Sequence, residues 1–279
     1  MKKKLNYKQI ILYIIVILFI IFLISILLKS PSNNLNWNDD QKILSFVEFE
    51  GDLININNIR NISYSSTSNY DVFYYNKTIN LDELVSLDYM IEDLKAFNGF
   101  AHTLLSFGFN DGSFISISVE VRKEESEHYS LSGGFLREFE LMNVIADERD
   151  VINLRANYRN DTIYLYPINI SKDSLDELFV MMLEKTNQLV EEPEFYNTFT
   201  STCTTNLAEV ASESTNEKFF KYHPHIILPE FSDKILLKKG LIKTNLTDIE
   251  EVREYFKINK QAREYQYSDE FSKQIRIYN

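Results

Sequence analysis

The single cysteine of this chain, Cys203, is the side chain best suited to covalent chemistry. It lies in the stretch EFYNTFTSTCTTNLAEV, among serine and threonine residues and directly before a run that predicts a helix. At a helix N-terminus, free N–H groups and the helix dipole favour a thiolate and can hold an oxyanion. A lone cysteine cannot form an internal disulfide, so Cys203 is either a small buried side chain or a nucleophile. The hydroxyl-rich neighbours favour the nucleophile.

A nucleophilic thiol needs a base, and the chain holds His102, His128, His223 and His225. His128 lies in the charged stretch RKEESEHYS, which predicts an exposed position. His223 and His225 flank a proline, but two metal-ligand side chains without a clear third are weak evidence for a metal site. His102 begins an apolar run that predicts a strand. There it is either a core histidine bonded to a backbone carbonyl or the base.

The runs AHTLLSFGF and SFISISVEV, separated by NDG, predict a β-hairpin whose turn uses the glycine. If residues 110–112 form a three-residue loop, His102 lies opposite Glu120 on the neighbouring strand. Directly opposed residues share a face of the sheet, about 5 Å apart. A carboxylate there can bond one imidazole nitrogen and leave the other to accept the thiol proton. The alternatives are a two-residue loop, which pairs His102 with Val121, and a solvated Glu120 paired with a neighbouring cation.

The elements that must position these residues alternate between strand and helix patterns. Strands are predicted for residues 43–49 and 53–64, for the hairpin, and within FELMNVIADERDVINLR and TIYLYPI. Helices are predicted for LDELVSLDYMIEDLKAF (residues 81–97), for KDSLDELFVMMLEKTNQLV behind the cap Ser171, and from Cys203 onward. Helices at both ends with strands between them indicate an α+β fold, an antiparallel sheet with packed helices.

An uncharged apolar run precedes this domain and is long enough to cross a membrane as one helix. The lysines of MKKKLNYKQ come before it, so the positive-inside rule places the N-terminus in the cytoplasm. We expect an uncleaved, single-pass anchor in the cell membrane, because no A-x-A pattern follows the run; a cleaved signal is the alternative. The predicted division is a basic cytoplasmic segment (1–9), a transmembrane anchor (10–28), a linker (29–42) and an extracytoplasmic catalytic domain (43–279).

The charge of the chain excludes one class of partner. Its formal net charge is −12. The N-terminal segment that holds the apolar run and its flanking lysines contains no acidic residue. The part beyond the anchor is therefore still more acidic than the whole. Such a field repels phosphate backbones, so no nucleic acid is expected as a partner.

Several segments, in order, resemble the N-terminal extracytoplasmic domain of the Lnb-type lipoprotein N-acyltransferases. They are AHTLLSFGFNDGSFISISVEVRKE, FELMNVIADERDVINLR, YLYPI, EFYNTFTSTCTTN and LPEFSDKILLKKGLI, within about residues 59–242. The resemblance implies a permuted papain-like, NlpC-like fold, in which the histidine strand precedes the cysteine helix. It implies Cys203 as nucleophile, His102 as base and Glu120 as the orienting residue, with no cofactor and no metal. One departure is Thr202, where the family usually has asparagine.

The resemblance also implies a reaction. An acyl chain passes from an ester of a membrane phospholipid to the Cys203 thiol, and then to the N-terminal amine of a bacterial lipoprotein. The expected partners are thus a phospholipid donor and a lipoprotein acceptor. Two alternatives stay open: a thiol amidase or peptidase that acts on cell-wall peptide, and a membrane-tethered binding domain whose thiol is inert.

Overall fold

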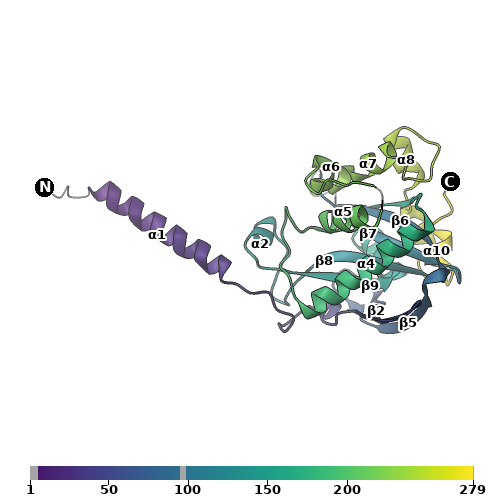
Figure 1. Ribbon diagram of the computed structural model, residues 1–279, viewed down its shortest axis with the longest axis horizontal. Coiled ribbons are helices and arrows are strands. Elements are labelled where there is room, and N and C mark those ends of the chain that lie inside the picture. Colours follow the sequence, from purple (N-terminus) through teal and green to yellow (C-terminus); the bar gives the residue numbers. More distant parts are fainter. Residues whose placement is uncertain (1–5, 95–98, 216, 279) are drawn as a thin grey trace.

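A long apolar helix projects from a folded body (Figure 1). The computed structural model describes residues 6–94, 99–215 and 217–278. Helix α1 (Tyr7–Leu27) is, within these ranges, the one helix long and apolar enough to cross a membrane. At about 1.5 Å per residue its 21 residues span about 31 Å, close to the thickness of a bilayer core. Asn6 caps its start, in a reciprocal capping box with Gln9.

The body is built on an eight-stranded sheet in the order β1-β2-β9-β8-β7-β6-β10, with β5 paired to β2. The strands are β1 (Phe46–Glu50), β2 (Leu53–Arg60), β5 (Tyr74–Asn80), β6 (Leu84–Asp93), β7 (Ala101–Phe109), β8 (Phe114–Arg122), β9 (Glu140–Asp147) and β10 (Thr162–Pro167), and a separate small ladder joins β3 (Ser63–Tyr64) to β4 (Tyr70–Asp71). Neighbouring strands in the sheet run antiparallel except β2 and β9, which are parallel. The predicted α+β class is confirmed.

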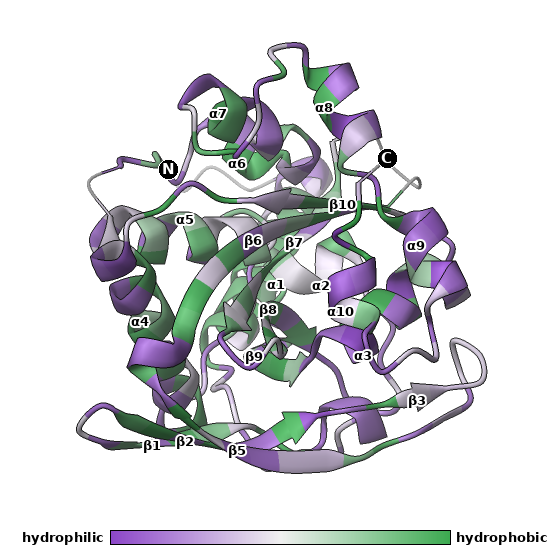
Figure 2. Ribbon diagram, turned by 90° about the vertical axis from the view of Figure 1, so that its right-hand side faces the viewer, coloured by the Kyte–Doolittle hydropathy of each residue, from purple (hydrophilic) through white to green (hydrophobic). Residues whose placement is uncertain are grey.

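Helices cover both faces of the sheet (Figure 2). Helices α4 (Lys172–Glu191) and α5 (Cys203–Ser214) pack on one face, and α3 (Glu148–Ile152), α9 (Asn259–Glu264) and α10 (Phe271–Gln274) on the other. The remaining helices are α2 (Leu131–Phe135), α6 (Pro224–Ile227), α7 (Ser232–Lys238) and α8 (Ile249–Tyr255). Successive side chains of a strand point to opposite faces, so Leu104 and Leu105 on β7 enter different cores. As predicted, Ser171 caps α4 and α5 begins at Cys203.

The helix predicted for residues 81–97 is wrong. Asn80 caps only a single 3₁₀ turn (Leu81–Glu83), after which the chain enters strand β6. This strand lies between β7 and β10 and is buried on both faces for most of its length. Such a strand loses the alternation of apolar and polar residues, so its sequence resembles a buried helix. Residues 95–97 of the predicted helix lie outside the described residues.

The second half of FELMNVIADERDVINLR is helical rather than extended. Strand β9 ends at Asp147, whose side chain accepts a hydrogen bond from the Arg149 N–H at 3.0 Å and caps α3. Helix α3 then passes directly into a π-helical turn (Asn153–Tyr158), a rare geometry that often occurs at functional sites. The turn carries Arg155 into the interior, where the residue is 2 % exposed.

The segment predicted as a linker, residues 29–42, packs against the body. The Asn33 amide donates to backbone carbonyls at the end of α4, and Lys29 Nζ donates to the Leu136 carbonyl at 3.0 Å. Trp37, the one tryptophan of the chain, is 3 % exposed and lies 4.2 Å from the Arg122 guanidinium. The polar composition of the segment concealed these contacts, because they are made mostly by one aromatic ring and side-chain amides.

Candidate active site

The β7–β8 hairpin has the predicted three-residue loop. The Phe109 N–H donates to the Ser113 carbonyl at 3.0 Å, and Gly112 takes φ +80°, a conformation that favours glycine. Ladder pairs such as Leu104 with Ser118 continue the same register. This register sets His102 opposite Glu120, with 3.8 Å between His102 Nε2 and Glu120 Oε1.

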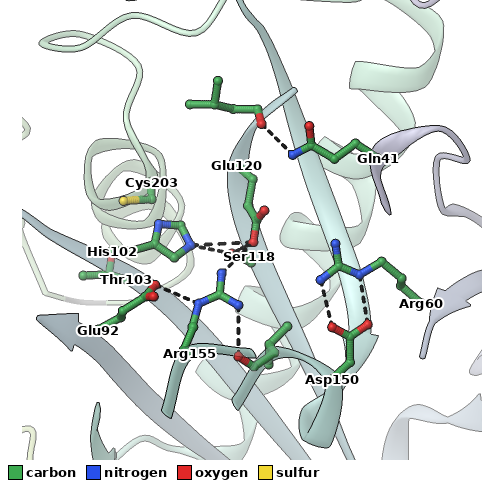
Figure 3. A network of polar contacts seen from close by, with 12 residues as sticks. Gln41, Arg60, Glu92, His102, Thr103, Ser118, Glu120, Asp150, Arg155 and Cys203 are labelled. Atoms are coloured by element: carbon green, nitrogen blue, oxygen red, sulfur yellow. Dashed lines mark hydrogen bonds and ion pairs between the residues drawn. The ribbon is translucent and has the colours of Figure 1, made fainter. Parts of the chain in front are cut away.

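A serine that the sequence reasoning missed lies between the two. Ser118 Oγ is 2.7 Å from His102 Nε2, and its hydroxyl donates to Glu120 Oε1 at 2.9 Å (Figure 3). Because the serine proton goes to the carboxylate, Ser118 accepts from the Nε2–H of His102. The direct separation of 3.8 Å is too long for a hydrogen bond, so Glu120 orients the ring through Ser118. Ser118 precedes Glu120 by two residues and therefore shares its face, which is the signal that the sequence offered.

The bonding of Nε2 leaves the other ring nitrogen for the cysteine. Figure 3 shows the imidazole of His102 between the Cys203 sulfur and the Ser118–Glu120 pair, so the ring lies beside the thiol. Cys203 is 8 % exposed and is the first residue of α5. Thr202 caps this helix, because its side chain accepts from the Thr205 N–H at 3.2 Å. Threonine and asparagine are both good N-caps, so the departure at Thr202 keeps the capping role.

The thiol and imidazole shift one another's pKa. Burial by itself raises the pKa of Cys203, but the charge and hydrogen bond of His102, with the Thr103 N–H, lower it to about 6. Burial opposes the charged form of His102, but the nearby Cys203 thiolate raises the pKa of the imidazole above its usual value. The pair therefore favours thiolate and imidazolium near neutral pH, which is the reactive form of a cysteine nucleophile.

Two carboxylates flank His102, and one arginine holds both. Glu92 faces His102 from β6, on the side opposite β8. Arg155 donates to Glu92 Oε2 and to Glu120 Oε1, each at 2.8 Å (Figure 3). Burial raises the pKa of Glu120, but Arg155 and the other nearby cations outweigh it and hold that pKa well below its usual range. Glu120 thus stays ionised beside the imidazole.

The other histidines lie apart from this centre. His128 and His223 are exposed, and His223 Nδ1 only accepts from the His225 N–H at 3.2 Å, at the start of α6. Among the described residues there is no group of three side chains that could hold a metal ion. Within the residues that the structure describes, His102 is thus the one histidine of the four that lies beside Cys203.

Cys203, His102 and Glu120 line one cleft of about 460 Å³. Its wall also includes Tyr196 and residues beside and within α2, among them Leu131. The cleft therefore has both ionised and apolar walls around the sulfur, as a site for an amphipathic substrate would require.

A family model described as the Lnb N-terminal periplasmic domain matches residues 70–228, more than half of the chain. The matched range contains His102, Glu120 and Cys203 together with the strands and helix that position them. No curated protein and no solved structure matches the chain. A periplasmic domain behind one apolar helix fits a membrane protein whose domain lies outside the membrane. As the sequence resemblance predicted, the chain belongs to the Lnb N-terminal periplasmic domain family.

Proposed function

We propose that this protein is a membrane-anchored cysteine acyltransferase of permuted papain-like fold. It moves an acyl chain from a lipid ester, through a thioester on Cys203, to the N-terminal amine of a bacterial lipoprotein. The observation that supports this best is the position of the His102 imidazole beside the Cys203 sulfur at the start of α5, where the pKa of the thiol is lowered to about 6. The strand that carries His102 also precedes the helix that carries Cys203, which is the permuted order.

In the first half-reaction the Cys203 thiolate attacks the carbonyl carbon of the ester. A carbon–sulfur bond forms as the carbon–oxygen bond to the glycerol breaks, and the imidazolium of His102 gives its proton to the leaving alkoxide. Backbone N–H groups in the first turn of α5 stabilise the oxyanion, because the first N–H groups of a helix have no intrahelical acceptor. The products are an acyl-enzyme and a lysolipid.

In the second half-reaction the neutral amine of the lipoprotein attacks the thioester carbonyl. A carbon–nitrogen bond forms, the carbon–sulfur bond breaks, and the amine proton passes to the His102 imidazole. Cys203 leaves as the thiolate and His102 regains its charge. Glu120, through Ser118, stabilises the imidazolium in both halves and holds the ring toward the sulfur.

The position of the cleft relative to α1 supports a lipid substrate. Helix α2, which supplies part of the cleft wall, ends where Lys29 Nζ donates to the Leu136 and Arg137 carbonyls. Arg137 in turn lies 3.4 Å from the carbonyl of Leu27, the last residue of α1. The end of α1 that faces the body thus lies near α2 (Figure 1), and α2 forms part of the cleft wall. This raises the effective concentration of substrates held in the same bilayer.

Exposed aromatic side chains lie in the same region. Phe135 of α2 and Phe199 of the loop before α5 are 42 % and 53 % exposed, and their rings lie 4.7 Å apart. Aromatic side chains are enriched at the interface between membrane and water. This pair is therefore suited to rest in the lipid headgroup region next to the entrance of the active site.

The test is mass spectrometry of lipoprotein N-termini in cells that lack the chain and are supplied with variants at matched protein levels. We expect N-acylated lipoprotein with the wild type and almost none with Cys203→Ser, because a hydroxyl is far less acidic than the thiol. His102→Ala should lose about as much, since nucleophile and base act as a unit. His128→Ala is the matched control, because that histidine is exposed and does not line the cleft.

Undiminished N-acylation with Cys203→Ser would overturn the proposal. Release of cell-wall peptides that requires Cys203, with lipoprotein N-termini unchanged, would instead support the thiol amidase. Unchanged lipoprotein and wall composition in cells without the chain would support the binding domain.

A further inference from the structure

A second cavity, of about 260 Å³, runs along α5 on the side of its first turn away from the active-site cleft. One stripe of the helix forms its wall, with Thr204, Ala208, Ala211 and Thr215 at helical spacing. Cys203 lines the active-site cleft and its neighbour Thr204 lines this cavity. The two spaces therefore share the first turn of α5 as a wall.

Most of the cavity lining is aliphatic. The sheet contributes Leu87 and Leu105, α4 contributes Leu178, and α7 contributes Leu236. Protein interiors are close-packed, and voids much larger than a water molecule are few because they destabilise the fold. An apolar cavity without polar partners does not hold water well but binds apolar ligands. A space of this size and composition is suited to a hydrocarbon chain.

The end of the cavity next to the thiol is polar. Thr204 Oγ1 is 3.6 Å from the Cys203 sulfur and 2.9 Å from Thr103 Oγ1. The Tyr89 hydroxyl lies 2.8 Å from Ser232 Oγ, and both residues line the cavity. Hydroxyl groups thus lie at the end near the nucleophile. The rest of the lining is mostly aliphatic, and its further polar members are Asn169, Ser171, Ser174, Thr215 and Glu217. This polarity matches a ligand with an ester at one end and a long apolar tail.

The length of the cavity also matches. From Thr204 to Thr215 the helix rises about 16 Å at about 1.5 Å per residue. One acyl chain spans half of a bilayer core of about 30 Å, which is about 15 Å. A chain whose carbonyl lies at Cys203 would therefore extend along the full stripe of α5.

We propose that this cavity is the binding site for the acyl chain of the lipid donor, an inference that rests on the acyltransferase function proposed above. The chain lies along α5 with its ester carbonyl at Cys203 and its tail toward Thr215. Helix α6 forms part of the boundary, because Ile226 lines the acyl cavity and Ile227 lines the active-site cleft. The chain passes between α5 and α6.

The test fills the cavity and compares two ester lengths. Ala211→Trp adds a large side chain inside it, and Glu213→Trp, the matched control, adds the same side chain to the exposed face of the same helix. The full chain is placed in nanodiscs of ether-linked phospholipid, which has no ester to attack. Acylation of Cys203 by nitrophenyl acetate and by nitrophenyl dodecanoate is then followed by mass spectrometry.

We expect the ratio of dodecanoyl to acetyl transfer to fall at least about tenfold in Ala211→Trp, which corresponds to about two methylene groups that lose burial. The wild type and Glu213→Trp should share one ratio. An unchanged ratio in a folded Ala211→Trp protein would overturn the inference. If Ala211→Trp does not fold, Ala211→Leu and Ala208→Leu provide the same comparison with smaller side chains.

A separate binding experiment tests the cavity independently of acyl transfer. Binding of a fluorescent dodecanoic acid is measured with Cys203→Ala, alone and combined with Ala211→Trp. If the wild type is acylated by neither ester, the proposed transfer function fails, and the binding arm alone decides on the cavity. Weaker binding in the combined variant supports the acyl site, and equal binding overturns it.

Discussion

Glu120→Gln tests whether charge, rather than geometry alone, activates the thiol. The substitution keeps the shape of the side chain, so the new amide can still accept from Ser118 and Arg155. It removes the negative charge 3.8 Å from His102 Nε2 and leaves the positive charge of Arg155 close by. Both changes disfavour the imidazolium, and without the imidazolium the thiolate loses its main support.

The magnitude follows from the separation of the charges. Two unit charges 3.8 Å apart interact by about 4 kcal/mol at an effective dielectric constant of about 20. This is an upper limit, because both side chains are 17 % exposed and the cleft admits water. One pKa unit corresponds to about 1.4 kcal/mol, so we expect the pKa of Cys203 to rise from about 6 by about 1 to 2 units.

The assay is the rate of alkylation of Cys203 by iodoacetamide as a function of pH, since only the thiolate reacts. At pH 6 we expect Glu120→Gln to react about tenfold more slowly than the wild type, and the difference to vanish in alkaline solution. Ser118→Ala is the matched comparison. It removes the bridging hydroxyl but keeps the charge, so it should slow acyl transfer through poorer orientation of the ring and move the thiol pKa little.

The refuting result is a thiol pKa in Glu120→Gln that equals the wild-type value, in protein shown to be folded by circular dichroism. Glu120 would then act on His102 by geometry alone. A larger pKa change in Ser118→Ala than in Glu120→Gln would also contradict the electrostatic reasoning.

Three further predictions concern the pH profile, the buried arginine and the aromatic pair. As the pH rises, the rate of single-turnover acylation of Cys203 should increase around the thiol pKa of about 6. It should fall again at higher pH, where the imidazolium of His102, whose pKa is raised, loses its proton. A rate that keeps rising into alkaline solution would contradict the ion pair. Arg155→Met leaves Glu92 and Glu120 without their shared cation, so urea unfolding should show a loss of about 3–5 kcal/mol. Arg159→Met, at a side chain 44 % exposed, should lose less than about 1 kcal/mol, and equal losses would count against the arginine network. Phe199→Glu should slow acylation of Cys203 from vesicle phospholipid, while Tyr267→Glu, at a residue 80 % exposed between α9 and α10, should not; equal rates in the two variants would show that the aromatic pair does not serve lipid access.

Local sequence signals were sufficient for a correct prediction where the structure depends on residues close together in the chain. The turn NDG with its glycine defines the hairpin loop, and counting outward from that loop is enough to pair His102 with Glu120. Ser171 and Thr202 lie directly before α4 and α5 and cap them with their own side chains. The uncharged run of α1 can be predicted without knowledge of its contacts, because its length and composition define it. In each case the interaction spans only a few residues.

The sequence misled where a residue's environment comes from distant elements. The apolar spacing of residues 84–93 fits a helix, but pairing with β7 and β10 makes this segment a central strand. The same limit applies to residues 148–155, where a cap and a π-helical turn replace the predicted extension of β9.

By itself, then, the sequence determined the apolar helix long enough to cross a membrane, the family and the candidate triad of Cys203, His102 and Glu120, since each depends on a contiguous run, an ordered set of motifs or a hairpin count. Only the tertiary structure brought the first turn of α5 against the hairpin and inserted Arg155 between Glu92 and Glu120. The cavity along α5 likewise exists only where β6, β7, α4 and α7 meet that helix. The physical reason is that charge balance, burial and enclosed volume depend on every element packed around a site, and these elements lie far apart in the chain.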